Sequence, residues 1–584
     1  MMKLGGVAFL AFVLLAGCAS KAPLPVVQPP AQWEQTFDYP VAFQKLLGND
    51  LLVVGTLRHL YGMDPRTGKV KWRLRNVNST DRDIANVSGA SYILINDAAG
   101  GAFDDVGSHV IAVDRLDGVF HWETGVLRGR VLQAAIDYQR EFLFAVTVQG
   151  AHGDDRGFFH DLLPGKGLFS GLKREPELTL IDLRDGTVRW QRLFGEEVEL
   201  RPAERRGVGG AGAAQAHRPF DLGLYHPPTI TGELVCVTYD GIACFRLSDG
   251  TPVWDQTLDV VDGDYGLSYP DPVVDREQLI VGDTKRLMAF SLDSGERRWR
   301  SEKLGRMAEV QEIGGILYVQ MGGQFFDLDD ERWEADGPFA ALAVDKFGGN
   351  LIWDYDDLDD SISNLLVVDD LVWLADEDDL IALDWSTGEE IHRLEHDFEE
   401  PPSLVTLNKR QQVVVVSESE VAAFHRQYPE RLWYQSYPPP RPGVWTRWSA
   451  SLMAATGNVF RFSSTLIAYG GSLLPSMPNV VAGGTQLISG RRALREVTGY
   501  LGDTLTEYGS IGSQSGFANL SGNTQYFLTE LDDEVALAAV DINAGRVKRL
   551  TILPANASQL ALDEINGLIY QAEANQLRAV PLGR

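Results

Sequence analysis

Residues 60–72 read LYGMDPRTGKVKW, and this stretch decides the fold because its pattern returns along the whole chain. An apolar run leads to Asp64, Gly68 follows four residues later, and Trp72 follows eight residues later. An Asp side chain can accept hydrogen bonds from the backbone of its own turn, and Gly adopts a positive φ at little cost. The stretch therefore predicts a β-hairpin whose second strand carries the Trp.

The pattern occurs nine times, and most copies keep both signature residues. The copies begin at Asp64, Asp114, Asp182, Arg246, Ser291, Asp345, Asp384, His425 and Asp541. Eight of nine keep the Gly and seven keep the Trp; Pro429 takes the Gly place of the eighth copy, and His392 and Arg549 take the Trp place of the seventh and ninth. Another β-rich run precedes each copy, and units of about 40–50 residues with four strands are typical of propeller blades. We expect each Trp to pack between neighbouring sheets.

The two ends of the chain complement each other. Leu568–Tyr570 and Gln576–Leu582 predict two strands after the ninth copy, and the Trp strand that they lack stands at Gln32–Glu34. N- and C-terminal strands that share one blade would close the ring and remove exposed sheet edges. The sequence therefore predicts an all-β, closed propeller of four-stranded blades, nine to ten in number.

Composition excludes several classes of function. The 584 residues include 81 acidic and 52 basic ones, a net charge of −29, which argues against nucleic acid as a partner. Three Cys residues are too few for a zinc ribbon or a disulfide scaffold, and none of them has the Cys-x-x-Cys spacing of a redox pair or a haem motif. No catalytic constellation and no metal-ligand spacing is visible, so we expect no catalytic residue, no cofactor and no bound metal.

The first residues have the form of an export signal. Lys3 precedes an apolar run, Leu4–Ala16, that is too short to span a bilayer and that leads to Gly17 and Cys18. This resembles a bacterial lipobox, which implies a signal peptide over 1–17, a diacylated Cys18 and a Pro-rich tether over 18–32. Ala19 after the Cys resembles Gram-negative lipoproteins of the outer membrane, with the body on the periplasmic side. The alternative is a plain secretory signal with a chance Cys.

The repeat and the leader together resemble a known family. The strand followed by Asp64, Thr67, Gly68 and Trp72 resembles the pyrroloquinoline-quinone-type (PQQ-type) propeller repeat. With the lipobox, the chain resembles the BamB family of outer-membrane assembly lipoproteins over residues 33–582. That family is non-catalytic and normally has eight blades; this chain is longer, so kinship rather than orthology is expected. The resemblance implies envelope proteins as partners, with the β-barrel assembly machinery as the candidate.

The blades are predicted over 33–433 and 521–584. Two segments interrupt the repeats within the first range, and a third separates the two ranges. The loop 151–177 is a candidate partner-binding loop, although it could instead fold back onto the ring; its large apolar residues include Phe158, Phe159, Leu162, Leu163 and Phe169. Residues 201–219 predict a flexible excursion. Residues 434–520 form the largest insertion, and Leu494, Val497, Leu501, Leu505 and Tyr508 in it have the spacing of an amphipathic helix, either docked on the ring or free to bind a partner or a membrane surface.

Two smaller features remain. Cys236 and Cys244 flank a short turn; a three-residue loop would place them opposite each other and allow a disulfide in the oxidising periplasm, whereas a two-residue turn would separate them. The acidic runs Asp357–Asp360 and Asp376–Asp379 lack the register of a calcium loop, so we expect a solvated charged rim.

Three functions are compatible with these features. The first is a non-catalytic scaffold on the outer membrane that binds envelope proteins. The second is a glycan- or peptidoglycan-binding propeller, in which aromatic residues such as Trp385 or Trp445 would stack on sugars. The third is a PQQ-dependent quinoprotein dehydrogenase, which the missing adjacent Cys pair and haem motif disfavour.

Overall fold

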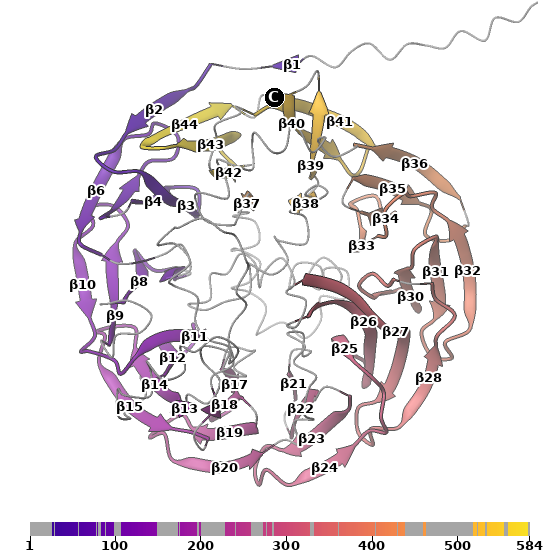
Figure 1. Ribbon diagram of the computed structural model, residues 1–584. Coiled ribbons are helices and arrows are strands. Elements are labelled where there is room, and N and C mark those ends of the chain that lie inside the picture. The colour runs from indigo at the N-terminus through magenta and orange to yellow at the C-terminus, as the bar shows by residue number, and fades with distance from the viewer. Residues whose placement is uncertain are drawn as a thin grey trace, which may run out of the picture.

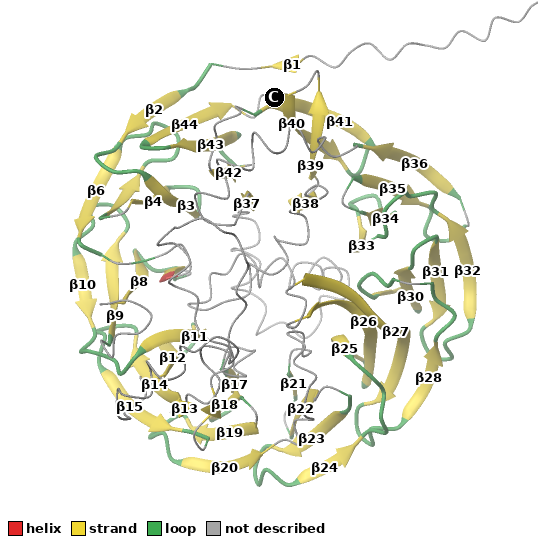
Figure 2. Cartoon of the chain, in the orientation of Figure 1, coloured by secondary structure: helices red, strands yellow, loops and turns green. Residues whose placement is uncertain are grey.

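The computed structural model describes most of residues 26–581, and the part described contains no α-helix; the short red segment in Figure 2 is a 3₁₀ turn. The longer segments outside the description are 1–25, 99–106, 149–172, 200–227, 258–271, 438–459, 463–517 and 582–584, and shorter gaps occur elsewhere. Cys18, the five apolar residues named in the loop 151–177, the excursion 201–219 and the expected helix within 434–520 all lie in those segments.

Ten four-stranded antiparallel sheets are arranged around a central axis as the blades of a propeller (Figure 1). Blades 1 to 5 consist of β3 (Val41–Leu47), β4 (Leu51–Thr56), β5 (His59–Met63) and β6 (Val70–Arg75); β7 (Ile84–Asn86), β8 (Tyr92–Ala98), β9 (Ser108–Asp114) and β10 (Phe120–Glu123); β11 (Arg130–Asp137), β12 (Phe142–Val148), β14 (Pro176–Asp182) and β15 (Val188–Leu193); β17 (Thr229–Thr231), β18 (Leu234–Thr238), β19 (Gly241–Arg246) and β20 (Pro252–Thr257); β21 (Val273–Val274), β22 (Gln278–Gly282), β23 (Leu287–Ser291) and β24 (Arg297–Arg300).

Blades 6 to 10 complete the arrangement. They consist of β25 (Met307–Ile313), β26 (Ile316–Asp327), β27 (Arg332–Asp345) and β28 (Leu351–Tyr355); β29 (Leu366–Val368), β30 (Leu371–Ala375), β31 (Asp379–Asp384) and β32 (Glu390–Glu395); β33 (Leu404–Leu407), β34 (Val413–Val416), β35 (Glu420–Phe424) and β36 (Arg431–Ser436); β38 (Ala518–Ser521), β39 (Thr524–Leu531), β40 (Glu534–Asp541) and β41 (Arg546–Ile552); β42 (Gln559–Asp563), β43 (Leu568–Glu573), β44 (Gln576–Pro581) and β2 (Trp33–Thr36). The all-β propeller prediction is confirmed, and the blade number is at the upper end of the predicted range.

The N-terminal strands lie on the last two blades. β2 pairs antiparallel with β44, Trp33 opposite Ala579, as expected for strands that share a blade. β1 (Val26–Val27) pairs in parallel with β41, so it lies outside blade 9. Within the tether predicted over residues 18–32, Val26 and Val27 are therefore paired with a blade strand.

Other strands depart from the predicted boundaries. β13 (Lys173–Arg174) and β16 (Val198–Glu199) form a separate two-stranded sheet, and β37 (Phe460–Phe462) adds a parallel strand to β42. Blade strands extend to Ser436 and resume at Ala518, so the insertion is shorter than 434–520 at both ends. The hairpin of β26 and β27 is paired as far as Asp327 and Arg332, and it projects inward from the ring as an arm that no sequence pattern predicted (Figure 1).

Each repeated Trp clamps its blade to the next one. The ring of Trp72 covers Gly118, where an added Cβ would meet the Trp at 2.6 Å, and the Trp72 indole N–H donates to the Arg115 carbonyl at 3.1 Å. Gly118 has a φ of +74° and its N–H donates to the Asp114 carbonyl, so the turn needs Gly for its shape as well as for space. The core clusters follow the same division, since each draws buried side chains from two neighbouring blades.

The clamp is repeated between eight pairs of neighbouring blades, and its members come from different copies of the repeat. The pairs are Trp33 on Gly68, Trp72 on Gly118, Trp122 on Gly186, Trp190 on Gly250, Trp254 on Gly295, Trp299 on Gly349, Trp353 on Gly388 and Trp433 on Gly545. Blade 7 carries His392 in the Trp place and blade 8 carries Pro429 in the Gly place, so both members are missing at the same interface. Arg549 takes the Trp place of blade 9, and in the next blade, blade 10, the strands β44 and β2 are not joined by a turn. Wherever a blade has another residue in the Trp place, the next blade thus lacks the Gly-containing turn on which that Trp would pack.

Candidate functional site

The strongest concentration of charge lies on blades 6 to 8. Residues 354–400 contain 18 of the 81 acidic residues and one of the 52 basic ones, and so contribute −17 of the net −29. The connection after β28, the hairpin between β30 and β31, and the connection after β32 lie at the same end of the blades, because successive antiparallel strands reverse direction. The exposed carboxylates of these three loops, called here the acidic face, belong to Asp356, Asp357, Asp359, Glu377, Asp378, Asp397, Glu399 and Glu400.

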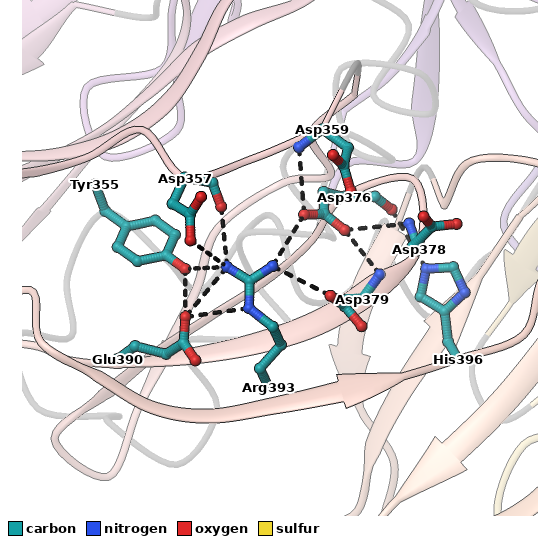
Figure 3. A network of polar contacts seen from close by, with 9 residues as sticks. All are labelled: Tyr355, Asp357, Asp359, Asp376, Asp378, Asp379, Glu390, Arg393 and His396. Carbon is teal, nitrogen blue, oxygen red and sulfur yellow. Dashed lines mark hydrogen bonds and ion pairs between the residues drawn. The ribbon is translucent and has the colours of Figure 1, made fainter.

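Arg393 on β32 joins the loops of the acidic face (Figure 3). Its guanidinium group lies 3.0 Å from an Asp357 carboxylate oxygen, 3.1 Å from Asp379 and 3.1 Å from Glu390. Tyr355 donates its hydroxyl hydrogen to Glu390 at 2.6 Å and accepts from Arg393 at 2.6 Å. The hydrogen bond from Tyr355 and the Arg393 charge hold the pKa of Glu390 below its usual range, and burial and Glu390 raise the pKa of Tyr355. Arg393 therefore positions the loops.

Asp376 and His396 form the buried floor below this network. The Asp376 side chain is fully buried and accepts backbone N–H groups from Asp378 at 3.2 Å and Asp379 at 2.7 Å. Burial raises the pKa of Asp376, despite these hydrogen bonds. His396 accepts the Phe398 N–H at Nδ1, which leaves Nε2–H to donate to the Asp376 carbonyl at 3.3 Å. Burial lowers the pKa of His396, in agreement with this neutral tautomer.

These contacts correct the expectation of a solvated rim. Asp376 is buried and Asp379 is ion-paired, and the two acidic runs, from neighbouring blades, meet around one arginine. Of the described acidic residues in those runs, Asp357, Asp359, Glu377 and Asp378 are exposed. What the arrangement can do chemically is to present excess negative charge on rigid loops, which attracts basic surfaces and steers their approach. The signal in the sequence that could have revealed this site is the near absence of basic residues from the acidic stretch 354–400, in which Arg393 is the single cation.

The structure brings together the two cysteines for which the sequence allowed a disulfide. Cys236 on β18 lies opposite Cys244 on β19, the register that a three-residue loop predicts, and their sulfur atoms are joined in a disulfide. Both side chains are buried against Trp254 and its neighbours. Cys18 and the residues Phe158, Phe159, Leu162, Leu163 and Phe169 lie outside the described residues, so their roles remain predictions. Trp385, in the turn between β31 and β32, packs partly buried against the core shared by blades 6 and 7, and its carbonyl accepts the Trp353 indole N–H at 3.0 Å.

Within the described ranges, no group of three or more His, Cys, Asp or Glu side chains is arranged to hold a metal ion. The same ranges contain no helix long and apolar enough to cross a bilayer.

Comparison with known proteins identifies the type of repeat. Residues 174–435, from blade 3 to blade 8, match the family model described as outer membrane protein assembly factor BamB. The predicted resemblance to PQQ-type repeat proteins of this kind is therefore confirmed over somewhat less than half of the chain. No curated protein matches the sequence.

Solved structures with some likeness include propellers of different activity. BamB from Moraxella catarrhalis is 14% identical, with 68% of this chain and 97% of that chain covered, at a TM-score of 0.33. A europium-containing methanol dehydrogenase is 11% identical, with 68% and 84% covered, at a TM-score of 0.32. The computationally designed protein Ika8 is 9% identical, with 65% and 94% covered, at a TM-score of 0.34. Likeness at this level identifies neither the blade number nor the function.

Proposed function

We propose that this chain, whose residues 174–435 match the BamB family, is a lipid-anchored scaffold on the periplasmic side of the outer membrane. It binds other envelope proteins there and takes part in outer-membrane protein assembly or envelope maintenance. The family match is the observation that carries the proposal. Cys18 at the end of the lipobox supplies the lipid anchor. A scaffold acts by binding, so the proposed role requires no catalytic group.

The clamped blades support a scaffold role physically. Strands are committed to sheet pairing, whereas loops are free to contact partners, so a rigid ring of blades presents many loops in fixed relative positions. Eight Trp–Gly clamps hold those positions. We further propose that the ring is closed, because β2 completes blade 10 while Trp33 packs on Gly68 of blade 1.

The loop 151–177 is the proposed main contact. Interface energy concentrates in a few aromatic anchors, and truncation of such an anchor costs roughly 2 kcal/mol or more. We expect the double variant Phe158→Ala/Phe159→Ala to lower the recovery of crosslinked partners while its thermal midpoint stays close to that of the wild type. A matched control is Phe347→Ala, which truncates an exposed aromatic residue in the turn of blade 6.

Either of two results would contradict the loop assignment. A double variant that unfolds places the two Phe side chains in the core. Unchanged capture with unchanged stability moves the contact elsewhere, and the acidic face and the insertion between Ser436 and Ala518 are then the next segments to alter.

A further inference from the structure

We propose that the outer edge of blades 9, 10 and 1 is a membrane-facing surface that binds the phosphate groups of anionic phospholipids. The surface holds the ring against the bilayer at one place on its circumference. The proposal deepens the function proposed above and rests on its lipid anchor at Cys18.

The N-terminal strands define which part of the ring is close to the anchor. β1 lies outside β41 of blade 9, β2 is the outermost strand of blade 10, and the Gln32 side chain donates to the Arg66 carbonyl of blade 1 at 2.8 Å. Eight Cα steps separate Cys18 from Val26. A fully extended chain covers at most about 3.4 Å per step, so the anchor lies within about 27 Å of β1.

Basic side chains flank these strands on both sides. Arg66 and Lys69 belong to the turn of blade 1, next to Gln32 and Trp33, and both are exposed. Arg546 and Lys548 stand at the start of β41 and are also exposed. β1 runs parallel to β41, with Val26 opposite Leu550. The N-terminal end of β1 is therefore on the same side as the N-terminal end of β41, which carries these two cations. These four residues are called here the basic edge.

The basic edge keeps its charge. Arg66, Lys69 and Arg546 form no ion pair within the described residues, and Lys548 lies 4.0 Å from an Asp541 oxygen.

Two of the neighbouring carboxylates are occupied by other cations, whereas Asp64 and Asp541 lie in the same turns as the four cations of the basic edge. Glu34 on β2 pairs with Arg578 at 3.1 Å, and Asp38 pairs with Arg73 at 3.3 Å. The local surplus is therefore positive in a protein whose net charge is −29.

The acidic face reinforces the same orientation. The turns that carry Arg66, Lys69 and Arg546 join the third and fourth strands of their blades, whereas the acidic face is built at the opposite end of the strands. An anionic surface repels that face and attracts the basic edge. Basic groups close to a lipid anchor add to membrane attachment by one acylated residue, and the attraction acts within a Debye length of about 10 Å.

Lysine labelling tests the proposal without a mutation. The full lipidated chain is reconstituted in phosphatidylcholine vesicles with or without phosphatidylglycerol, treated briefly with an amine-acetylating reagent, and analysed by mass spectrometry. We expect Lys69 and Lys548 to react roughly threefold or more slowly on the anionic vesicles, and Lys303, exposed on blade 5, to react equally on both. Salt at about 0.5 M should abolish the protection, since the Debye length is then about 4 Å.

A charge variant gives the second test. Arg66→Gln/Arg546→Gln should lose most of the protection at Lys69 and Lys548, whereas the matched control Arg297→Gln/Arg298→Gln on β24 should keep it. Equal labelling of both lysines on neutral and anionic vesicles, in a chain that floats with the vesicles, would overturn the inference alone. A chain that does not float with the vesicles overturns the anchor and the proposed function with it.

Discussion

Two carboxyl groups on β14 show how the surroundings of a single residue set its pKa. Glu177 and Asp182 stand at either end of this strand, and both are buried. Burial raises the pKa of Glu177, and its Oε1 has no hydrogen-bond partner within the described residues. Hydrogen bonds from Arg184 and Arg189 hold the pKa of Asp182 far below its usual range. The same functional group, a carboxyl, therefore contributes to stability with opposite signs at the two positions.

Asp182→Asn should destabilise the protein at neutral pH by about 2 kcal/mol, the scale of hydrogen bonds to a charged group. A lowered pKa means that this contribution is present above the pKa of the unfolded chain, near 4, and is lost as the pH falls toward the folded value. Thermal midpoints measured across the acidic range should therefore converge for variant and wild type at low pH. A difference that stays constant with pH would contradict the assignment.

Glu177→Gln should have the opposite effect. Because the pKa of Glu177 is raised, the ionised group weakens the folded state as the pH rises above the pKa of the unfolded chain, and the amide removes this penalty. We expect a gain of roughly 1 kcal/mol at pH 7 and none well below pH 4, measured in the same midpoint series. A loss of stability at pH 7 would show that the carboxylate has a partner.

At the scale of single elements, the sequence predicted the hairpin and its Trp but not the partner of the Trp. The offsets of Asp, Gly and Trp within one copy are local and follow from turn geometry. The contact of Trp190 with Gly250 joins two copies, so no pattern within one copy contains it. The signal was nevertheless present, because the missing Trp at His392 and the missing Gly at Pro429 belong to consecutive copies.

A comparison of two clamps separates the packing of the Trp from its hydrogen bond. The Trp190 indole N–H donates to the Leu247 carbonyl at 2.9 Å. At Trp433 the indole N–H has no partner within the described residues, and the corresponding carbonyl, that of Ile542, accepts from Asn408 at 2.8 Å instead. Trp190→Phe should therefore cost about 1 kcal/mol more than Trp433→Phe in urea unfolding. Equal costs would mean that the hydrogen bond contributes nothing.

Other elements could not be read from the chain for physical reasons. The arm of β26 and β27 begins at an irregularity in the pairing, between Met321 and Gly323, and the glycines there do not by themselves distinguish an arm from the end of a blade hairpin. Arg393 is one cation in a long acidic stretch, and its importance comes from the loops that surround it in space. The pairing of Cys236 with Cys244 depended on the length of one turn, which the sequence left open between two registers.

For the whole molecule, the distribution of charge and the position of the N-terminal strands suggest how the ring is used. The strands that precede blade 1 lie on blades 9 and 10, next to the basic edge, whereas the acidic face belongs to blades 6 to 8 and the opposite end of the strands. An anchored ring in this orientation would leave the acidic face directed toward the periplasm and open to partners. The sequence predicted that the N- and C-terminal strands share a blade, but where the acidic and basic residues lie relative to each other could be seen only in the folded structure.

The most direct measurement is the set of proteins crosslinked to the anchored chain in intact envelopes, identified by mass spectrometry beside Cys18→Ala as the unanchored control. A scaffold predicts a discrete set of outer-membrane assembly proteins with the wild type, and its loss or strong reduction with Cys18→Ala. Palmitate labelling should be absent from the variant. The same set recovered with both chains, or a wild-type chain that captures no envelope protein and carries quinone absorbance instead, would contradict the account.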